Sequence, residues 1–226
     1  VEALAELDED TRDALMEALP SEVIASAIKK LDTDDALYLI EDMEKAEQEE
    51  ILSKVSREDR AALNRALDYP EYSAGRLMQT EFVAVPEFWS VGQTIDHIRA
   101  ARDIPDDFVE IYVVDPGFHL KGVMPLSRVL RSKRVAKVSE VMDTEQTVFT
   151  VLEQQEDIAY KFEQYNLVSA AVVDDAGRLV GTLMVDDIVD VIQEEAEEDI
   201  LHLGGVGAEE TITDTVWQTT RSRFSW

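Results

Sequence analysis

The sequence predicts an α+β multidomain fold, in which an all-α helical-repeat solenoid precedes a duplicated β-α-β-β-α unit and a last helix. Three observations lead to this fold class. Apolar positions recur every twelve residues over 1–69, and the stretch 112–130 recurs 59 residues later as 171–189. A purely acidic helical pattern, residues 185–199, then closes the duplicated region.

The solenoid is expected over residues 1–69, with a truncated first unit. Each unit ends on one apolar residue of the series Leu7, Leu19, Leu31, Met43, Val55 and Leu67. Turn and cap residues follow, and Ser21, Thr33 and Ser56 are expected to cap the next helices. Each unit has about two helical turns, too few to bury an apolar face alone, so stacked neighbours must share a core.

The second region contains the two copies of the β-α-β-β-α unit. The stretch "LMQTEFVAV" (77–85) corresponds to "VMDTEQTVFTV" (141–151). The β-branched runs "IYVVD" and "AAVVD" predict buried strands, and Asp-Pro-Gly and Asp-Asp-Ala-Gly predict tight turns after them. We expect the copies to pack as a pseudo-twofold pair. Gly204 and Gly205 should end the acidic helix before the last one.

The overall charge limits the classes of partner. Lys and Arg total 21 against 49 Asp and Glu, a formal net charge of −28. Nucleic acid is excluded as a partner because neutralising phosphates requires a basic surface. Cations or a basic protein surface fit better, and an acidic surface that only confers solubility is the alternative. The absence of cysteine rules out disulfides and thiolate zinc sites.

No catalytic motif is present. The sequence has no Walker A motif and no G-x-S-x-G, and its histidines, His97, His119 and His202, lack metal-ligand spacing. No apolar run approaches the ~18 residues of a membrane span. A non-enzymatic binding protein is therefore predicted.

The acidic helix is the strongest local signal. The stretch "VDDIVDVIQEEAEED" carries eight carboxylates and no Lys or Arg. On a helical wheel with Asp187 at zero, Asp190, Glu194 and Glu198 form one stripe with it. The predicted core face covers 100° to 220° and holds Ile188, Val189, Ile192, Ala196 and Ile200.

Such concentrated repulsion calls for a counter-charge. The helical array has acids of its own, so two acidic surfaces would repel unless cations lie between them. Mg²⁺ takes oxygen ligands, keeps several waters and uses one or two carboxylates, which suits weak sites at a domain interface. A solvated acidic face is the alternative, since like charges at i,i+4 cost only ~0.2–0.5 kcal/mol per pair.

Together these motifs resemble a known family. The twelve-residue repeats, the junction "YPEYSAGRLMQTEFVAV", the paired units and "VDDIVDVIQEEAEEDILHLGGVG" are similar to the cytosolic part of an MgtE-type magnesium transporter. The units resemble two CBS domains, 70–137 and 138–203, and 204–226 resembles the connecting, or plug, helix that leads to a membrane domain absent from this chain.

The resemblance implies a Mg²⁺ sensor rather than an enzyme. In such a protein, Mg²⁺ bound between the helical domain and the CBS pair favours the closed state of the channel. It also implies a homodimer formed through the CBS domains, with the protein's own transmembrane domain as a further partner. The chain would then be a soluble fragment that lies on the cytoplasmic side of the inner membrane in the full-length protein.

Position by position, the resemblance implies a set of Mg²⁺ ligands: Glu2, Asp34, Glu156, Asp187, Asp190, Glu195, Glu198 and Asp199. Asp187 with Glu2 and Asp34 would form an interdomain bridge. Three positions depart from the family pattern. Gln154, Asn166 and Tyr38 stand where the family often has an acid, so at least one site would differ here.

An adenine nucleotide is the alternative ligand, because CBS domains bind such molecules. Their usual ribose signature is Gly, then Ser or Thr three residues later, then Asp six later. The second unit has Gly181, Met184 and Asp187, and the first ends on Arg128. Both copies lack the hydroxyl residue, so ATP near Asp187 remains an open alternative. A second rival function is a scaffold that docks a basic protein on the helical array.

Overall fold

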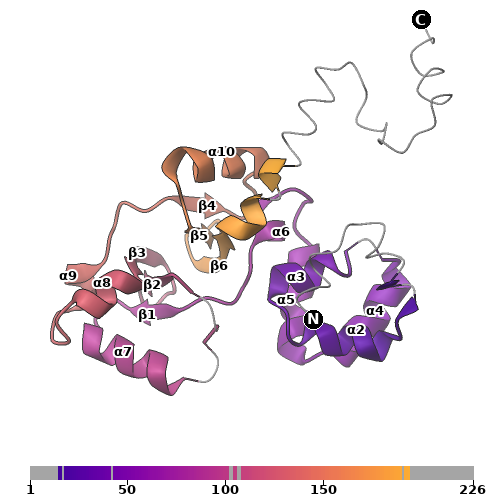
Figure 1. Cartoon of the computed structure of the whole chain (residues 1–226), viewed down its shortest axis with the longest axis horizontal. Helices are drawn as coiled ribbons and strands as arrows, with labels where there is room; N and C mark the ends of the chain where they lie inside the picture. The colour runs from indigo at the N-terminus through magenta and orange to yellow at the C-terminus, as the bar shows by residue number, and fades with distance from the viewer. Residues whose placement is uncertain are drawn as a thin grey trace, which may run out of the picture.

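The computed structural model describes residues 15–16, 18–41, 43–101, 104–105, 108–189 and 191–193. These residues form a helical domain and two β-containing units, which confirms the expected α+β fold class (Figure 1). The last helix, expected in 204–226, lies outside the described residues.

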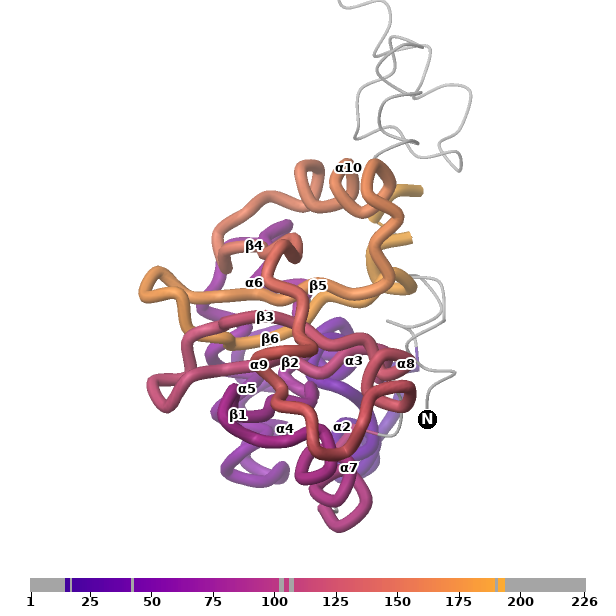
Figure 2. Tube along the Cα trace, turned by 90° about the vertical axis from the view of Figure 1, so that its left-hand side faces the viewer, coloured from indigo at the N-terminus to yellow at the C-terminus, as the bar shows by residue number. Residues whose placement is uncertain are grey.

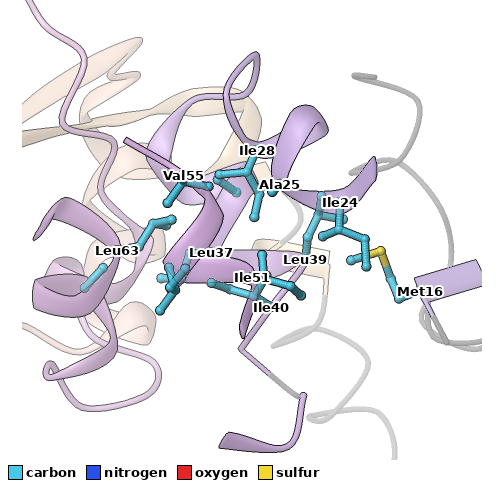
Figure 3. Packing of buried hydrophobic residues seen from close by; sticks show 13 residues of the cluster. Met16, Ile24, Ala25, Ile28, Leu37, Leu39, Ile40, Ile51, Val55 and Leu63 are labelled. Carbon is cyan, nitrogen blue, oxygen red and sulfur yellow. The ribbon is translucent and has the colours of Figure 1, made fainter. Parts of the chain in front are cut away.

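The helical domain repeats with the predicted period. Its helices are α2 (Ser21–Ile28), α3 (Thr33–Tyr38), α4 (Lys45–Lys54) and α5 (Arg57–Leu67), so each begins twelve residues after the one before. The helix α2 packs on α4, and α3 packs on α5. Figure 3 shows their apolar side chains meeting in one core, with Leu37, Ile40 and Ile51 at its centre. Short helices are thereby stabilised by neighbours rather than by their own length.

The caps agree with the prediction in one place and differ in two. Ser56 is the N-cap of α5, and its hydroxyl accepts a hydrogen bond from a backbone N–H, as expected. Ser21 and Thr33 are instead the first helical residues, and Pro20 and Asp32 take the N-cap positions without a side-chain cap. The two hydroxyls are free to bond outside their own helices.

Both β-units have the same construction. The first comprises β1 (Ala84–Pro86), α7 (Val91–Ala100), β2 (Glu110–Val114), β3 (Leu120–Pro125) and α8 (Leu126–Arg131). The second comprises β4 (Val148–Thr150), α10 (Gln155–Tyr165), β5 (Ser169–Val173), β6 (Leu179–Met184) and helical residues at 185–189 and 191–193. In each, the middle strand pairs parallel with the first and antiparallel with the third. The register irregularity falls at 113/114 and at 172/173, which keeps the 59-residue spacing.

The two units share a small core. Tyr112 and Val123 of the first sheet are buried with Ala171 and Leu179 of the second. The Tyr112 hydroxyl lies 2.5 Å from that of Thr182, deep between the sheets. The β2–β3 and β5–β6 hairpins project to the same side in Figure 2, and the backbones of their turns are hydrogen-bonded.

Each unit is completed by the segment that leads into the other. The short helix α6 (Ala74–Leu77) precedes the first unit but packs in the core of the second, and its Ala74 N–H donates to the Glu153 carbonyl over 2.8 Å. The equivalent helix α9 (Val138–Val141) precedes the second unit but packs in the core of the first. Figure 1 shows α6 beside β6. The segment that follows the helical domain therefore packs against the second unit before the chain enters the first unit.

Two glycines allow this exchange. A Cβ on Gly122 would lie 2.5 Å from the Asp143 carbonyl oxygen, and one on Gly181 would lie 2.5 Å from the Met78 sulfur and 2.9 Å from the Gln79 carbonyl oxygen. Both distances are shorter than real Cβ contacts, so the leading segments reach the strands only because these positions have no side chain.

Candidate functional site

Two acidic side chains from different domains meet in the structure. Asp34 lies in the first turn of α3, and Asp187 lies in the helical stretch after β6. Their carboxyl groups are within hydrogen-bonding contact of each other. These are two of the three residues expected to form the interdomain bridge, and the contact joins the helical domain to the second β-unit.

The burial of Asp187 follows from the helix that carries it. Ile188 and Val191 are buried in the core of the second unit, with Val185 and Ile192 partly buried, whereas Val189 is 41% exposed. The core face therefore covers about 40° to 160° on the wheel. The expectation that Val189 faces the core was wrong, because the helix is rotated by about 60°. That rotation places Asp187 at the edge of the core face, where it is half-buried.

The surroundings raise the pKa of both carboxyl groups. Burial is the largest cause for Asp187, followed by the charges of Asp186 and Asp35, and its pKa rises to about 7. The hydrogen bond from Asp34 and one from the Met184 backbone oppose that rise. The pKa of Asp34 is raised well above its usual range by burial first and by Asp187 second. Like charges held this close disfavour double ionisation.

One buried carboxylate oxygen of the Asp34–Asp187 pair is unsatisfied by the part of the chain that the structure describes. Among the described residues, Oδ2 of Asp187 has no hydrogen-bond partner, although it is buried. A buried carboxylate oxygen without a partner costs free energy unless a cation, proton or water satisfies it. The donor set here is all oxygen, which fits Mg²⁺ and excludes a soft metal. No three His, Cys, Asp or Glu side chains cluster in the described part of the chain.

The other expected ligands are not brought to this pair by the described residues. Glu156 lies exposed in the first turn of α10 and does not contribute to the shifts of Asp34 or Asp187. The remaining expected ligands lie outside the described residues: Glu2, Asp190, Glu195, Glu198 and Asp199.

The three departures from the family pattern have local structural settings. Asn166 ends α10 with a φ of 52°, in the left-handed region that Asn tolerates better than most residues. Gln154 is the N-cap of the same helix, and Tyr38 is the last residue of α3. At Asn166 the backbone conformation gives a reason for an amide in place of an acid.

Two further interdomain contacts were not expected from the sequence. Thr33, beside Asp34, hydrogen-bonds Glu81 in the segment before β1. Arg76 of α6 pairs with Glu41 over 3.0 Å, and both side chains are largely shielded from solvent. Both residues lie in the junction stretch 69–85, but nothing in that stretch indicates that their side chains contact the helical domain, so only the three-dimensional arrangement identifies these contacts.

A cleft between the two units is the place to test for a nucleotide. It has a cavity volume of only about 20 Å³ and is lined by residues 79, 81–83, 108–110, 112, 169, 182 and 184. Among the residues that the structure describes, Glu81 and Glu110 are its charged lining residues, and no Lys or Arg lines it. Burial raises the pKa of Glu110, whose carboxylate accepts a 2.8 Å hydrogen bond from Ser169. This lining does not fit a triphosphate, which needs cationic or N–H-rich surroundings.

Comparison with known proteins gives these features a family context. A family model described as the MgtE intracellular N domain matches residues 1–72, and one for the CBS domain matches residues 138–194. The solved cytosolic domain of the Mg²⁺ channel MgtE, in complex with ATP, superposes with a TM-score of 0.77 at 30% identity, over 84% of this chain and 78% of that one. This chain belongs to the MgtE family. Its described residues correspond to the cytosolic domain of that MgtE channel.

Curated MgtE relatives extend the match along the chain. The magnesium transporter MgtE of Bacillus subtilis is 26% identical over 99% of this chain, and that of Thermus thermophilus is 34% identical over 77%. The chain spans 49% and 39% of the length of these relatives, so it corresponds to part of an MgtE protein. No helix in the described part of the chain combines the length and apolarity that a membrane crossing needs.

Proposed function

We propose that this chain is the Mg²⁺-sensing regulatory region of a magnesium transporter, in which Mg²⁺ between the helical domain and the CBS pair favours the closed state. The observation that carries the proposal is the contact between the Asp34 and Asp187 carboxyl groups. A sensor needs a contact that is unfavourable without its ion, and two half-buried carboxylates from separate domains provide one.

The other interdomain contacts make this pair decisive. The Arg76–Glu41 ion pair and the Thr33–Glu81 hydrogen bonds hold the domains together. Charge-assisted hydrogen bonds of this kind each contribute about 1.5–3 kcal/mol. The repulsion at Asp34 and Asp187 opposes them, so the docked arrangement is finely balanced. A divalent cation that neutralises the pair tips the balance towards docking by mass action.

The remaining parts of the proposal rest on the family. Magnesium transporters are membrane proteins by their function, and the relatives carry additional length beyond the matched region. We infer that a transmembrane domain follows this region in the complete protein, and that the region lies on its cytoplasmic side. A homodimer formed through the CBS units and a non-enzymatic role are part of the same proposal.

The test measures compaction of the chain as Mg²⁺ is added. Small-angle scattering is recorded from zero to roughly 20 mM Mg²⁺, with NaCl series of matched ionic strength to control for screening. We expect the radius of gyration to fall with Mg²⁺ and not with NaCl. Equal compaction in both salts would mean that the acidic side chains form only a screened surface, and the proposal would be wrong.

Two variants locate the effect. Asp187→Asn and Asp34→Asn each remove one ligand and relieve the repulsion, so we expect the Mg²⁺-dependent part of the compaction to shrink or vanish. Glu145→Gln removes one negative charge at an exposed position of the second unit and serves as the matched control. If Glu145→Gln had the same effect as Asp187→Asn, overall charge rather than the pair would be responsible.

Adenine-nucleotide binding is the second candidate. The related cytosolic domain was solved in complex with ATP. In this chain the acidic cleft lining and the missing ribose-signature hydroxyls argue against a triphosphate in that cleft. A thermal-shift series with ATP in EDTA separates the two functions, since nucleotide-dependent stabilisation without a Mg²⁺ response would favour the nucleotide module.

A further inference from the structure

One side chain from the CBS pair reaches into the helical domain beside the candidate site. Glu81 stands between Gln79, which pairs with β6, and the first strand of the CBS pair. Its carboxylate accepts hydrogen bonds from the Thr33 hydroxyl at 2.8 Å and from the Thr33 backbone N–H at 3.1 Å. Both donors belong to the first residue of α3.

The contact is built from both sides. Thr80, the neighbour of Glu81, lies 2.7 Å from the Thr33 hydroxyl and donates its own backbone N–H to Glu81 over 3.0 Å. Thr33 is only 6% exposed, so its hydroxyl is removed from water and depends on these partners. Losing the Glu81 carboxylate would leave the Thr33 backbone N–H without this acceptor and the hydroxyl with Thr80 alone, which costs more than the loss of an exposed hydrogen bond.

The position of this contact links it to Asp34. Thr33 and Asp34 are consecutive residues of one helix, and the Asp34 carboxyl meets Asp187 across the same domain boundary. Holding Thr33 therefore fixes the backbone immediately before Asp34. The Thr33–Glu81 contact contains no cation, so it acts whether or not the acidic pair is neutralised.

We propose that Glu81 is the positioning residue of the Asp34–Asp187 pair: it holds Thr33, keeps the helical domain docked without a cation, and sets how much Mg²⁺ is needed to close the pair. The second half of this inference rests on the proposed function. The first half, cation-independent docking through Glu81, stands apart from it and can be measured in EDTA.

The absence of cysteine gives a clean measurement. Cysteines are introduced at Ala46 of α4 and Ala176 of the β5–β6 turn, two exposed and uncharged positions, and carry spin labels. The distance distribution between the labels is recorded in EDTA and along a Mg²⁺ series. Dilution with unlabelled chain removes distances between subunits.

The variants are Glu81→Gln, Thr33→Val, their double variant, and Thr33→Ser. Thr33→Val keeps the side-chain volume and loses the hydroxyl, whereas Thr33→Ser keeps the hydroxyl. We expect Glu81→Gln and Thr33→Val each to raise the undocked fraction in EDTA and the Mg²⁺ midpoint by about tenfold. The double variant should be little worse than either single one, because Glu81→Gln removes the charge from the acceptor and Thr33→Val removes the donor of the same charge-assisted hydrogen bond. Thr33→Ser should behave as wild type.

A merely structural role would give another pattern. Urea unfolding of the CBS pair should be unchanged in Glu81→Gln, and a general loss of fold would instead lower its midpoint. If Glu81→Gln and Thr33→Val left both the EDTA distances and the Mg²⁺ midpoint at wild-type values, the inference would be overturned. Fully additive effects in the double variant would also contradict it.

Failure of the sensor is recognised separately. If Mg²⁺ changed no distance in the wild-type chain while Glu81→Gln still raised the undocked fraction in EDTA, the docking role would hold and the proposed function would be wrong. If Mg²⁺ acted equally on wild type and Glu81→Gln, the sensor would hold and the positioning role would be wrong.

Discussion

The two CBS units carry opposite charges at equivalent positions of the helical segments that follow their third strands. Arg128 in the first unit and Asp187 in the second are 59 residues apart, at corresponding positions after the third strand. Arg128 lies 3.7 Å from the Asp143 carboxylate and donates to the Val141 carbonyl, so its partners come from within the CBS pair. Asp187 instead faces Asp34, a like charge from another domain.

The difference shows how a duplicated scaffold acquires a responsive position. In the first unit the side chain has complementary partners and makes an ordinary ion pair. In the second unit the same backbone position carries a charge that none of its neighbours among the described residues neutralises. The first arrangement is complete without a ligand, whereas the second depends on a proton or a cation.

The units also differ in how they fill their cores, and this gives the largest expected effect. Val85 and Phe149 correspond and are both fully buried, but Phe149 stacks on Phe162 with centroids 5.8 Å apart. Phe149→Ala should lower the free energy of unfolding by about 3–5 kcal/mol, because it leaves a large cavity. Val85→Ala removes fewer atoms and should cost less. Urea unfolding monitored by circular dichroism measures both, and equal losses would contradict the difference between the cores.

Grafting the first unit's residue onto the second tests the charge comparison directly. Asp187→Arg would face Asp34 with an opposite charge and form an ion pair in a half-buried position. We expect the helical domain to dock in EDTA and the Mg²⁺ response to be lost, as measured by small-angle scattering. Asp186→Arg makes the same change of charge at the exposed neighbouring position and should keep a Mg²⁺ response. A normal Mg²⁺ response in Asp187→Arg would show that Asp187 does not bind the ion.

The raised pKa values predict a dependence on pH. In the docked arrangement the pKa of Asp187 is about 7, above its usual value of 3.8. A carboxyl whose pKa is raised by docking favours docking when protonated, so this contribution is present at low pH and is lost as pH rises through about 7. In EDTA, docking should therefore weaken as pH rises from about 3.8 to about 7 and change little above that, whereas Mg²⁺ should bind more tightly at the higher pH. Label distances measure both trends, and Asp187→Asn should flatten them.

The smallest effect is expected in the first unit. Arg128→Gln breaks an ion pair whose side chains are 43% and 47% exposed, and such pairs contribute about 0.2–1 kcal/mol. The Mg²⁺ midpoint should stay at the wild-type value, since Arg128 contacts Asp143 and Val141 within the CBS pair. A shift as large as that of Asp187→Asn, measured in the same scattering series, would mean that the two positions are functionally equivalent.

The repeats made most of the fold predictable. A period of twelve gave the helix starts, and a spacing of 59 gave the order of strands, because local pattern determines local structure in both regions. The Asp34–Asp187 pair was also expected, though from the resemblance to MgtE rather than from spacing. Nothing in the pattern alone places two residues from separate domains opposite each other.

The parts that escaped prediction depend on contacts between distant segments. Thr33 has the composition of an N-cap, but its hydroxyl bonds Glu81, 48 residues away. Val189 has the spacing of a core residue, but packing of Val191 rotates the helix and exposes it. In both cases the local sequence pattern predicted one environment for the side chain, and tertiary packing placed the side chain in a different one.

The exchange of leading segments has a consequence for how the chain is made. Residues 74–78 leave the ribosome before the first CBS unit, yet the surface that buries Ala74 and Met78 is completed only by the second unit. During synthesis, more than a hundred further residues must be added before residues 74–78 can be buried. This takes about 5–20 s at usual elongation rates. The helical domain can close its own core meanwhile, whereas the CBS pair must assemble as a single late event. A break between the two units would consequently leave both halves with an uncovered apolar seam.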